Sequence, residues 1–364
     1  MLKSLLRDRK LIALLVLAIF IKVFSLNEAW VETWYTYGFY PFWSRLERTL
    51  LGWIPLSVGD LLYIFSFIFL ILKAWKFLRL LAKRKVREYL SWILFRKYLR
   101  LVLWIYIIFN LSWGLNYNRL GIAHQLGLSV KAYDREDLVQ IATLLQERLN
   151  HYAAQTDSIK RLEFNRHSRL TSQARDDYER AAKNYSFLKY RSPSIKTSLL
   201  SPLGHLFGFS GYINPFTGEA QMNNKEPVYL KPFVINHEIA HQLGYGKENE
   251  ASFVSFLVTK ESSSIDFRYS LYYELYFDAL YEMRVNGELE AQVELRKTLH
   301  PRVVIDKMEE QKLRQRNRNV LQPYVTDFYS GYLKMNNQPG GMSTYNEVIA
   351  WLIAYVKKYG VENL

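Results

Sequence analysis

Two histidines separated by three residues, with a glutamate beside the first, are the residues in this sequence best suited to chemistry. Residues 237–241 read His-Glu-Ile-Ala-His, and side chains four positions apart lie on one face of a helix. His237 and His241 can therefore reach the same metal ion. Glu238 lies one step round the helix, where it can contact a water on that ion without binding the ion itself. The chain has no cysteine, so any zinc site must use histidine and carboxylate ligands.

A third ligand is expected just beyond this motif, because a catalytic zinc ion takes three protein ligands and keeps one position open for water. The turn at residues 244–246 is followed by a second helical pattern with acids at positions 248 and 250. A short turn would fold this helix back against the first and bring an acid to the metal. Glu250 is the predicted ligand. Glu248 is the alternative. It ranks second because it lies earlier, and an acid at the start of a helix can serve only to interact favourably with the helix dipole.

The residues around the motif favour a helix. Pro232 suits a first helical turn, and Gly244 is a natural stop. Apolar residues between them provide a surface that can be buried. The short motif also occurs by chance, so the alternative is an amphipathic helix whose two histidines bind no metal.

Three apolar stretches in the first third of the chain are long enough to cross a bilayer. They cover about residues 11–30, 56–78 and 98–117, and each supplies roughly the 20 residues that a membrane helix needs. We therefore predict an anchor of three transmembrane helices over residues 1–117, followed by one domain over residues 118–364. A cleaved signal peptide is the alternative for the first stretch, and buried core helices are the alternative for the other two.

Basic residues determine the expected orientation of this anchor. They cluster before the first stretch and between residues 73 and 100, whereas the loop between the first two stretches carries only Arg45 and Arg48. The positive-inside rule then places the N-terminus in the cytoplasm and the domain after the third stretch on the outer face. Much of the net charge of +14 is assigned in this way to topology and to attraction for anionic lipid headgroups. A nucleic-acid partner is accordingly not expected.

The domain after the anchor is predicted to be rich in helix. Helical spacing covers residues 134–154 and 171–187, and it resumes at Pro232 and continues to the end of the chain. Residues 192–225 have a different composition, with proline, glycine and serine among apolar residues, and residues 213–220 indicate a hairpin. The predicted fold class is therefore α-rich α+β.

Residues 237–253, read as H-E-x-x-H-x-x-G-x-x-x-E-x-E-A-x-F, resemble the zincin metallopeptidases. The E-x-E-A half is similar to that of peptidases that cleave phage-type repressors, in which the acid before the alanine binds zinc. Over a longer span, the three apolar stretches, the Asn-Tyr at residues 116–117 and this motif resemble a family of uncharacterised bacterial membrane proteins with a zincin-like domain. These resemblances imply Glu250 as the ligand, a metal-binding helix under a small sheet, and a place in the bacterial cytoplasmic (inner) membrane with the domain on the periplasmic face.

Together these features predict a membrane-anchored zinc metallopeptidase. One zinc ion is expected on His237, His241 and Glu250. Glu238 is expected to act as the general base on a zinc-activated water. The expected partners are the lipid bilayer and a peptide or protein substrate whose sequence cannot be read from the chain.

Two further features concern the substrate. A tyrosine or histidine is expected to assist the oxyanion, and His205, Tyr212 and Tyr245 are the candidates. Residues 211–223 are a candidate edge strand that could pair with an extended peptide.

Three other functions are open at this stage. The first is a non-enzymatic membrane protein whose zinc site is structural or inactive and whose domain binds an envelope partner. The second is a protein that uses its positive charge to bind a lipid surface or nucleic acid. The third is a metal-dependent hydrolase that acts on a carbonyl other than a peptide, because the same three ligands polarise any carbonyl.

Overall fold

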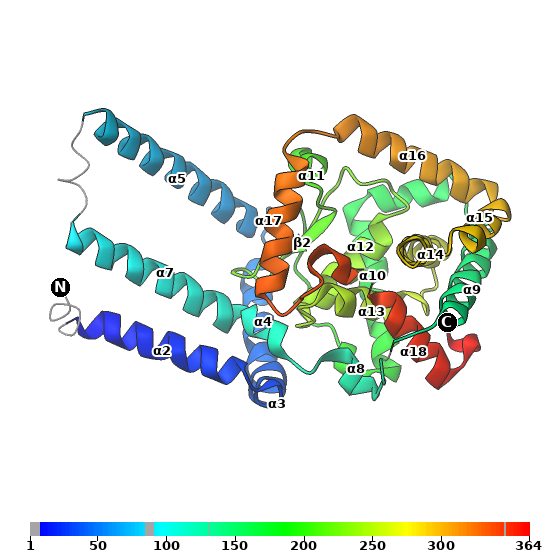
Figure 1. The fold of residues 1–364 in the computed structure, drawn as a ribbon, viewed down its shortest axis with the longest axis horizontal. Coiled ribbons are helices and arrows are strands. Elements are labelled where there is room, and N and C mark those ends of the chain that lie inside the picture. Colours follow the sequence, from blue (N-terminus) through cyan, green and yellow to red (C-terminus); the bar gives the residue numbers. More distant parts are fainter. Residues whose placement is uncertain (1–7, 84–90, 131, 346) are drawn as a thin grey trace.

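The computed structural model describes residues 8–83, 91–130, 132–345 and 347–364. Within this part of the chain the fold is mostly helical, with one small sheet. Figure 1 shows a globular helical body that contains the sheet, and three long helices that extend from one end of the body. The predicted mostly helical fold with a small sheet is confirmed at this level.

The three extended helices are α2 (Arg9–Ser25), α5 (Val58–Ala82) and α7 (Trp92–Ser112). α2 and α7 run toward the body and α5 runs away from it (Figure 1), so the start of α2, the end of α5 and the start of α7 lie at the tips far from the body. Asp8 joins α2 to α7 near these tips through ion pairs with Arg96 (3.6 Å) and Arg100 (2.9 Å).

Length and composition support one of the three predicted membrane spans. Among the described residues α5 is long and apolar enough to cross a membrane, and none of its apolar window is buried. A second candidate arises only if α2 and the segment Glu28–Leu51, bent by 99° relative to each other, form one span. The predicted span of residues 11–30 is interrupted because α2 ends at Ser25. α7 carries three basic residues in its first half, which lowers its mean hydropathy.

A continuous helical segment follows α2 and connects the extended helices to the body. It consists of α3 (Glu28–Trp30), the π-helix η1 (Val31–Phe39) and α4 (Tyr40–Leu51). Glu32, Tyr40 and Ser44 are buried, whereas Trp34 and Phe42 are exposed. The segment therefore has one face against the body and one aromatic face on the surface.

The helices of the body follow in chain order. They are η2 (Gly114–Asn118), α8 (Gly121–Leu126), α9 (Arg135–Ala153), η3 (Lys160–Asn165), α10 (His167–Asn184), η4 (Ser186–Leu188), α11 (Ser201–Phe207), α12 (Lys231–Gln242), α13 (Glu248–Thr259), α14 (Ile265–Val285), α15 (Leu289–Lys297), α16 (Pro301–Asn317), α17 (Gln322–Met335), η5 (Gly341–Tyr345), α18 (Val348–Tyr359) and η6 (Val361–Asn363). The predicted helix over residues 134–154 is confirmed as α9, whose Asp134 forms a capping box with Asp137. The predicted helix over residues 171–187 begins earlier, at His167.

The sheet has three short strands, β1 (Ile195–Thr197), β2 (Gly211–Ile213) and β3 (Ala220–Met222), in the order β1-β3-β2. β2 and β3 are antiparallel with Ile213 opposite Ala220, so the predicted hairpin over residues 213–220 is confirmed. β1 pairs in parallel with β3. Of the candidate edge strand over residues 211–223, only β2 lies at an edge, because β3 is paired on both sides and is the central strand.

The core of the body surrounds α12 and α13. Every residue of both helices is buried, and α12 packs against α13, α14, α10 and strands β2 and β3. A buried apolar side chain contributes about 1.5–3 kcal/mol to folding, so the position of these helices is strongly determined. Because α12 has no exposed face, each of its polar side chains must find a partner inside the protein.

A buried ion pair joins the segment after α2 to the body. The guanidinium of Arg119 contacts the carboxylate of Glu32 at 3.1 Å, and it also donates to the carbonyl of Gly244 at 3.0 Å. The ring of Tyr245 lies 4.5 Å from the guanidinium. Both charged side chains are almost fully buried, so each depends on the other for its compensation.

We expect Arg119→Met to lower the free energy of unfolding by about 3–5 kcal/mol, because it leaves the Glu32 carboxylate buried without its counter-charge. The double variant Glu32→Gln with Arg119→Met should lose much less. Lys297→Met is the control, since its exposed pair with Glu294 should contribute less than about 1 kcal/mol. Chemical denaturation of the full chain in detergent measures all three. Equal losses in the first two variants would contradict a compensated pair.

Candidate metal centre

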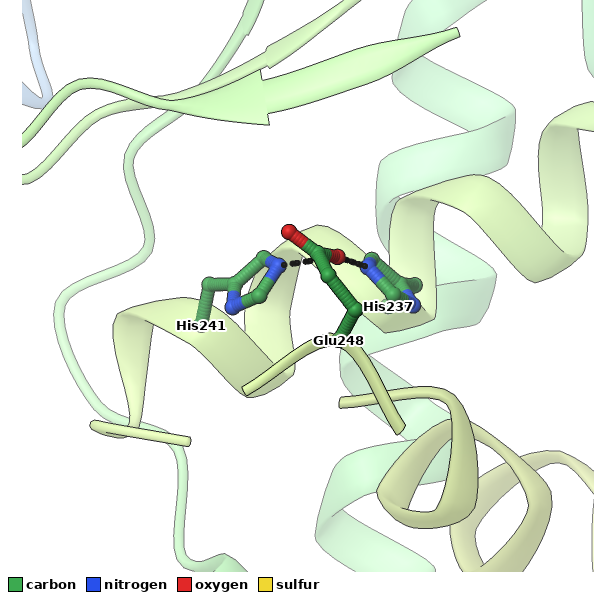
Figure 2. Close-up of side chains that lie close together, drawn as sticks. All are labelled: His237, His241 and Glu248. Atoms are coloured by element: carbon green, nitrogen blue, oxygen red, sulfur yellow. Dashed lines mark hydrogen bonds and ion pairs between the residues drawn. The ribbon is translucent and has the colours of Figure 1, made fainter. Parts of the chain in front are cut away.

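The two histidines of the motif lie one turn apart on α12 and point to the same side (Figure 2). Pro232 lies in the first turn of α12, as the sequence predicts. The two imidazole rings are 4.7 Å apart, centroid to centroid, and nearly perpendicular to each other. Both side chains are buried, so the burial that fixes α12 also fixes the direction of both rings.

Glu248 supplies the third donor of the cluster. It is the first residue of α13, which follows a turn in which Gly244 has a φ of +89°. One carboxylate oxygen of Glu248 lies 3.0 Å from Nε2 of His237 and 3.3 Å from Nε2 of His241 (Figure 2). Ligand atoms on a tetrahedral zinc ion lie roughly 3.3 Å apart, given bonds of about 2.0–2.1 Å. The two distances to Glu248 are close to this spacing, and the three ligand atoms all lie within 4.8 Å of one another, so together they could hold one metal ion.

Glu250, the predicted third ligand, is not brought into this cluster, whereas Glu248, the alternative, is. Residues two apart on a helix do not face each other, so a helix that directs Glu248 toward the histidines directs Glu250 away from them. The Glu250 carboxylate lies 3.7 Å from the ammonium of Lys247. It also packs against Gly121, where an added Cβ would lie 2.1 Å from a carboxylate oxygen.

The hydrogen bonds of His241 show that a positive charge is needed between the donors. Its Nδ1 lies 2.6 Å from the carbonyl oxygen of Tyr245, which can only accept, so Nδ1 carries a proton. In the neutral ring Nε2 is then an acceptor, and it faces the Glu248 carboxylate, which is also an acceptor. Two acceptors in contact require a proton or a metal cation between them.

The pKa directions agree with this reading. Burial favours the neutral imidazole of His241, but the charge of Glu248 and the hydrogen bond to it, the charge of Glu238 and the hydrogen bond to Tyr245 together outweigh burial and raise the His241 pKa to about 9. Burial opposes ionisation of Glu248, yet the two imidazoles hold its pKa well below the ordinary value. Burial lowers the pKa of His237. The cluster is therefore a carboxylate that attracts a cation, whether a proton or a metal ion.

Glu238 lies beside this cluster and against strand β2. An added Cβ at Gly211 would lie 2.6 Å from a carboxylate oxygen of Glu238, so only glycine allows this approach. Burial raises the pKa of Glu238 to about 8. Its other carboxylate oxygen is buried without a hydrogen-bond partner among the described residues. Glu238 thus combines a proton-accepting oxygen with a position next to the metal-binding donors.

Residues from the C-terminal part of the chain complete the surroundings of the donors. The hydroxyl of Tyr329 donates to Glu248 at 3.0 Å, and the ring of Tyr345 stacks on His237 at a centroid distance of 6.3 Å. The side-chain oxygen of Gln338 accepts from the backbone N–H of Glu248 at 2.9 Å. The place of these residues beside the donors is not predicted from the sequence, because no short-range pattern connects them to a motif about 80 to 110 positions earlier.

Residues that precede the predicted boundary at residue 117 hold the end of α12. The hydroxyls of Tyr40 and Ser44 each donate to the carbonyl of Gln242 at 3.1 Å. The indole N–H of Trp113 donates to the carbonyl of His241 at 3.4 Å. These donors satisfy carbonyls that a helix end leaves without partners. The segment assigned to the anchor is therefore part of the structure that positions the site.

A pocket of about 410 Å³ opens in front of the donors. Glu238, His241 and Glu248 lie in its wall. Strand β2, the first turns of α5, the last turns of α7 and one face of α17 form the rest of the wall. Most of the remaining lining is aromatic. The cluster therefore faces a space that a substrate could occupy.

The three oxyanion candidates occupy different places. Tyr212 lines the pocket, where its hydroxyl is hydrogen-bonded to Asp60. Tyr245 is outside the pocket lining and donates to Gln125. His205 is hydrogen-bonded to the carbonyl of Lys225 and is not part of the pocket lining. Tyr212 alone of the three remains placed for this role.

A family described as "protein of unknown function (DUF3810)" has a model that matches residues 35–353. The chain belongs to this family. The match includes His237, Glu238, His241 and Glu248, and its description assigns no activity, in agreement with the resemblance to an uncharacterised family. No curated protein and no solved structure matches the chain.

Replacement of each acid by glutamine distinguishes the two possible third ligands. We expect Glu248→Gln to weaken zinc binding by at least about 100-fold, because loss of a direct ligand should exceed the 10–100-fold cost of losing an outer contact. Glu250→Gln is the matched control and should bind zinc like the wild type. Competition with a zinc-binding dye and metal analysis of the purified proteins measure both. Loss of zinc from Glu250→Gln alone would contradict the assignment.

Proposed function

We propose that the chain is a membrane-anchored, zinc-dependent peptidase. The observation that carries the proposal is the convergence of His237, His241 and Glu248 in front of a pocket, with the buried carboxylate of Glu238 beside them. Two histidines and one carboxylate are a typical donor set for catalytic zinc. When bound, such an ion would acidify water and polarise a carbonyl group.

Glu238 is the proposed general base. In hydrolysis its free oxygen would take one proton from the attacking water as the new C–O bond forms. The same carboxyl group would then give that proton to the leaving nitrogen as the C–N bond breaks. A purely structural metal site has no need for such a group, which favours catalysis over the non-enzymatic alternative.

The edge strand β2 favours a peptide substrate over other carbonyl compounds. Gly211, Tyr212 and Ile213 line the pocket, and β2 pairs with β3 along one edge only. An extended peptide could add to the other edge through backbone hydrogen bonds. Such pairing would present a scissile carbonyl next to Glu238 without requiring a particular side chain.

The three extended helices support a membrane anchor with the body on the outer face. Most of their apolar side chains are exposed, and an α2 of 17 residues is about 26 Å long, close to the hydrocarbon thickness of about 30 Å. Basic residues lie at the tips far from the body, including Arg9, Arg79 and Lys83. We therefore propose three spans, with the tips in the cytoplasm of a bacterial cell and the body in the periplasm.

Glu238→Gln tests the catalytic proposal. We expect this variant to bind zinc as tightly as the wild type and to lose at least about 100-fold in peptide hydrolysis, because the general base is removed. Digestion of a random peptide library by the zinc-loaded full chain, read by mass spectrometry, measures the loss. Undiminished cleavage by the variant would contradict the assigned base. A wild-type protein that binds zinc and leaves the library intact would favour a structural site.

Single cysteines test the topology, because the natural chain contains none. We expect Lys83→Cys at the tip of α5 to be protected from a membrane-impermeant maleimide in intact spheroplasts and to react after lysis. Val293→Cys, exposed on α15 of the body, should react before lysis. The opposite pattern would show that the body faces the cytoplasm.

A further inference from the structure

The wall of the pocket is built partly from the roots of the extended helices. Tyr63 in the second turn of α5, Phe109 near the end of α7 and Trp113 just after α7 line the same pocket as Glu238 and His241. The metal centre thus lies at the level where α5 and α7 join the body.

The same turns of α5 and α7 also expose apolar side chains on the outside of the protein. Phe65 follows Tyr63 by two residues and is 65% exposed, and Ile108 directly precedes Phe109 and is 45% exposed. Exposed apolar side chains on a membrane helix contact lipid. If α5 and α7 span the bilayer, the pocket therefore begins at the depth where lipid begins.

Helix α17 forms a second wall of the pocket and carries an apolar stripe on its outer face. Figure 1 shows α17 running across the roots of the extended helices. Tyr324, Phe328 and Met335 are 74%, 80% and 88% exposed, and their spacing places them on one side of the helix. A helix with such a stripe is suited to lie in the surface of a bilayer. Phe328 also lines the pocket, so this stripe reaches the pocket mouth.

The segment that follows α2 carries a second aromatic face. Trp34, Phe42 and Trp53 are exposed on and just after the segment that follows α2. Tryptophan and other aromatic residues are enriched where membrane proteins meet the lipid headgroups. Two separate surfaces next to the helix roots are therefore suited to the same bilayer interface.

The lining of the pocket indicates what could enter from this interface. Tyrosine, phenylalanine and tryptophan make up most of it, and the described lining contains no lysine or arginine. A phosphate headgroup would find no arginine or lysine there to bind it. An apolar, aromatic-rich peptide would be accommodated, and segments next to transmembrane helices have this composition.

We propose that the pocket is entered from the bilayer surface between α17 and the roots of α5 and α7, and that the substrate is the membrane-proximal segment of a membrane-anchored polypeptide. The inference rests on the proposed peptidase function. A substrate chain that leaves the bilayer would pass Phe328, extend along β2 and present its backbone to Glu238.

Two tethered substrates test the proposal at equal surface concentration. Each has one transmembrane helix and the same random-sequence segment, placed either directly after the helix or after a flexible glycine–serine linker of about 30 residues, which spans roughly 30 Å. The zinc-loaded full chain and one substrate are reconstituted in phosphatidylethanolamine–phosphatidylglycerol vesicles. Because both substrates are tethered, the gain in effective concentration is similar for the two.

We expect cleavage of the directly attached segment to be at least about tenfold faster than cleavage of the distant one, with Glu238→Gln inactive on both. Equal rates, or a preference for the distant segment, would overturn the membrane-proximal substrate and leave the peptidase proposal standing. Cleavage of neither substrate by zinc-loaded protein would contradict the peptidase proposal, and this inference with it.

A second measurement does not depend on activity. Tyr324→Cys is labelled with an environment-sensitive fluorophore in the cysteine-free chain, and Val293→Cys on α15 is the matched control. Figure 1 shows α15 at the end of the body opposite the extended helices. We expect lipid-attached nitroxides to quench the label at position 324 and not the label at 293. A label at position 324 that the nitroxides quench no more than the label at 293 would show that α17 does not contact the bilayer.

Discussion

One carboxylate between two buried imidazoles is the interaction on which the rest of the site depends. The Tyr245 carbonyl fixes the proton of His241 on Nδ1, so the ring directs a lone pair at Glu248, and the pair is stable only with a cation between them. That requirement determines which acid is used, because the first residue of α13 faces the histidines and the third does not. It also explains the hydrogen bonds from Tyr329 to the carboxylate and from the backbone of Glu248 to Gln338, which hold Glu248 in place.

Helix α12 is also held at its end by residues from far earlier in the chain. Tyr40 and Ser44 bind the last carbonyls of α12, and Arg119 connects Glu32 to the turn at Gly244. Helix ends need such partners when water cannot reach them. The extended helices and the body are consequently one structural unit, and the family match, which begins at residue 35, covers most of this connection.

Local patterns predicted the parts of the structure that depend on neighbouring residues. The helix that carries His237 and His241, the helix over residues 134–154 and the hairpin over residues 213–220 follow from side-chain periodicity and turn residues, and all three are present. The sequence did not predict that Glu248 rather than Glu250 lies beside the histidines, because this depends on where α13 begins, and a shift of two residues reverses the face. The break after Ser25 and the approach of Tyr329 and Tyr345 depend on tertiary packing between distant segments, which periodicity does not report.

The most direct test of the proposed centre is anomalous diffraction at the zinc absorption edge from crystals of the zinc-loaded full chain. We expect one anomalous peak within about 2.0–2.2 Å of Nε2 of His237, Nε2 of His241 and a carboxylate oxygen of Glu248. A zinc-loaded crystal with no peak at this position, or with its peak at Glu250, would contradict the metal centre and the catalysis proposed from it.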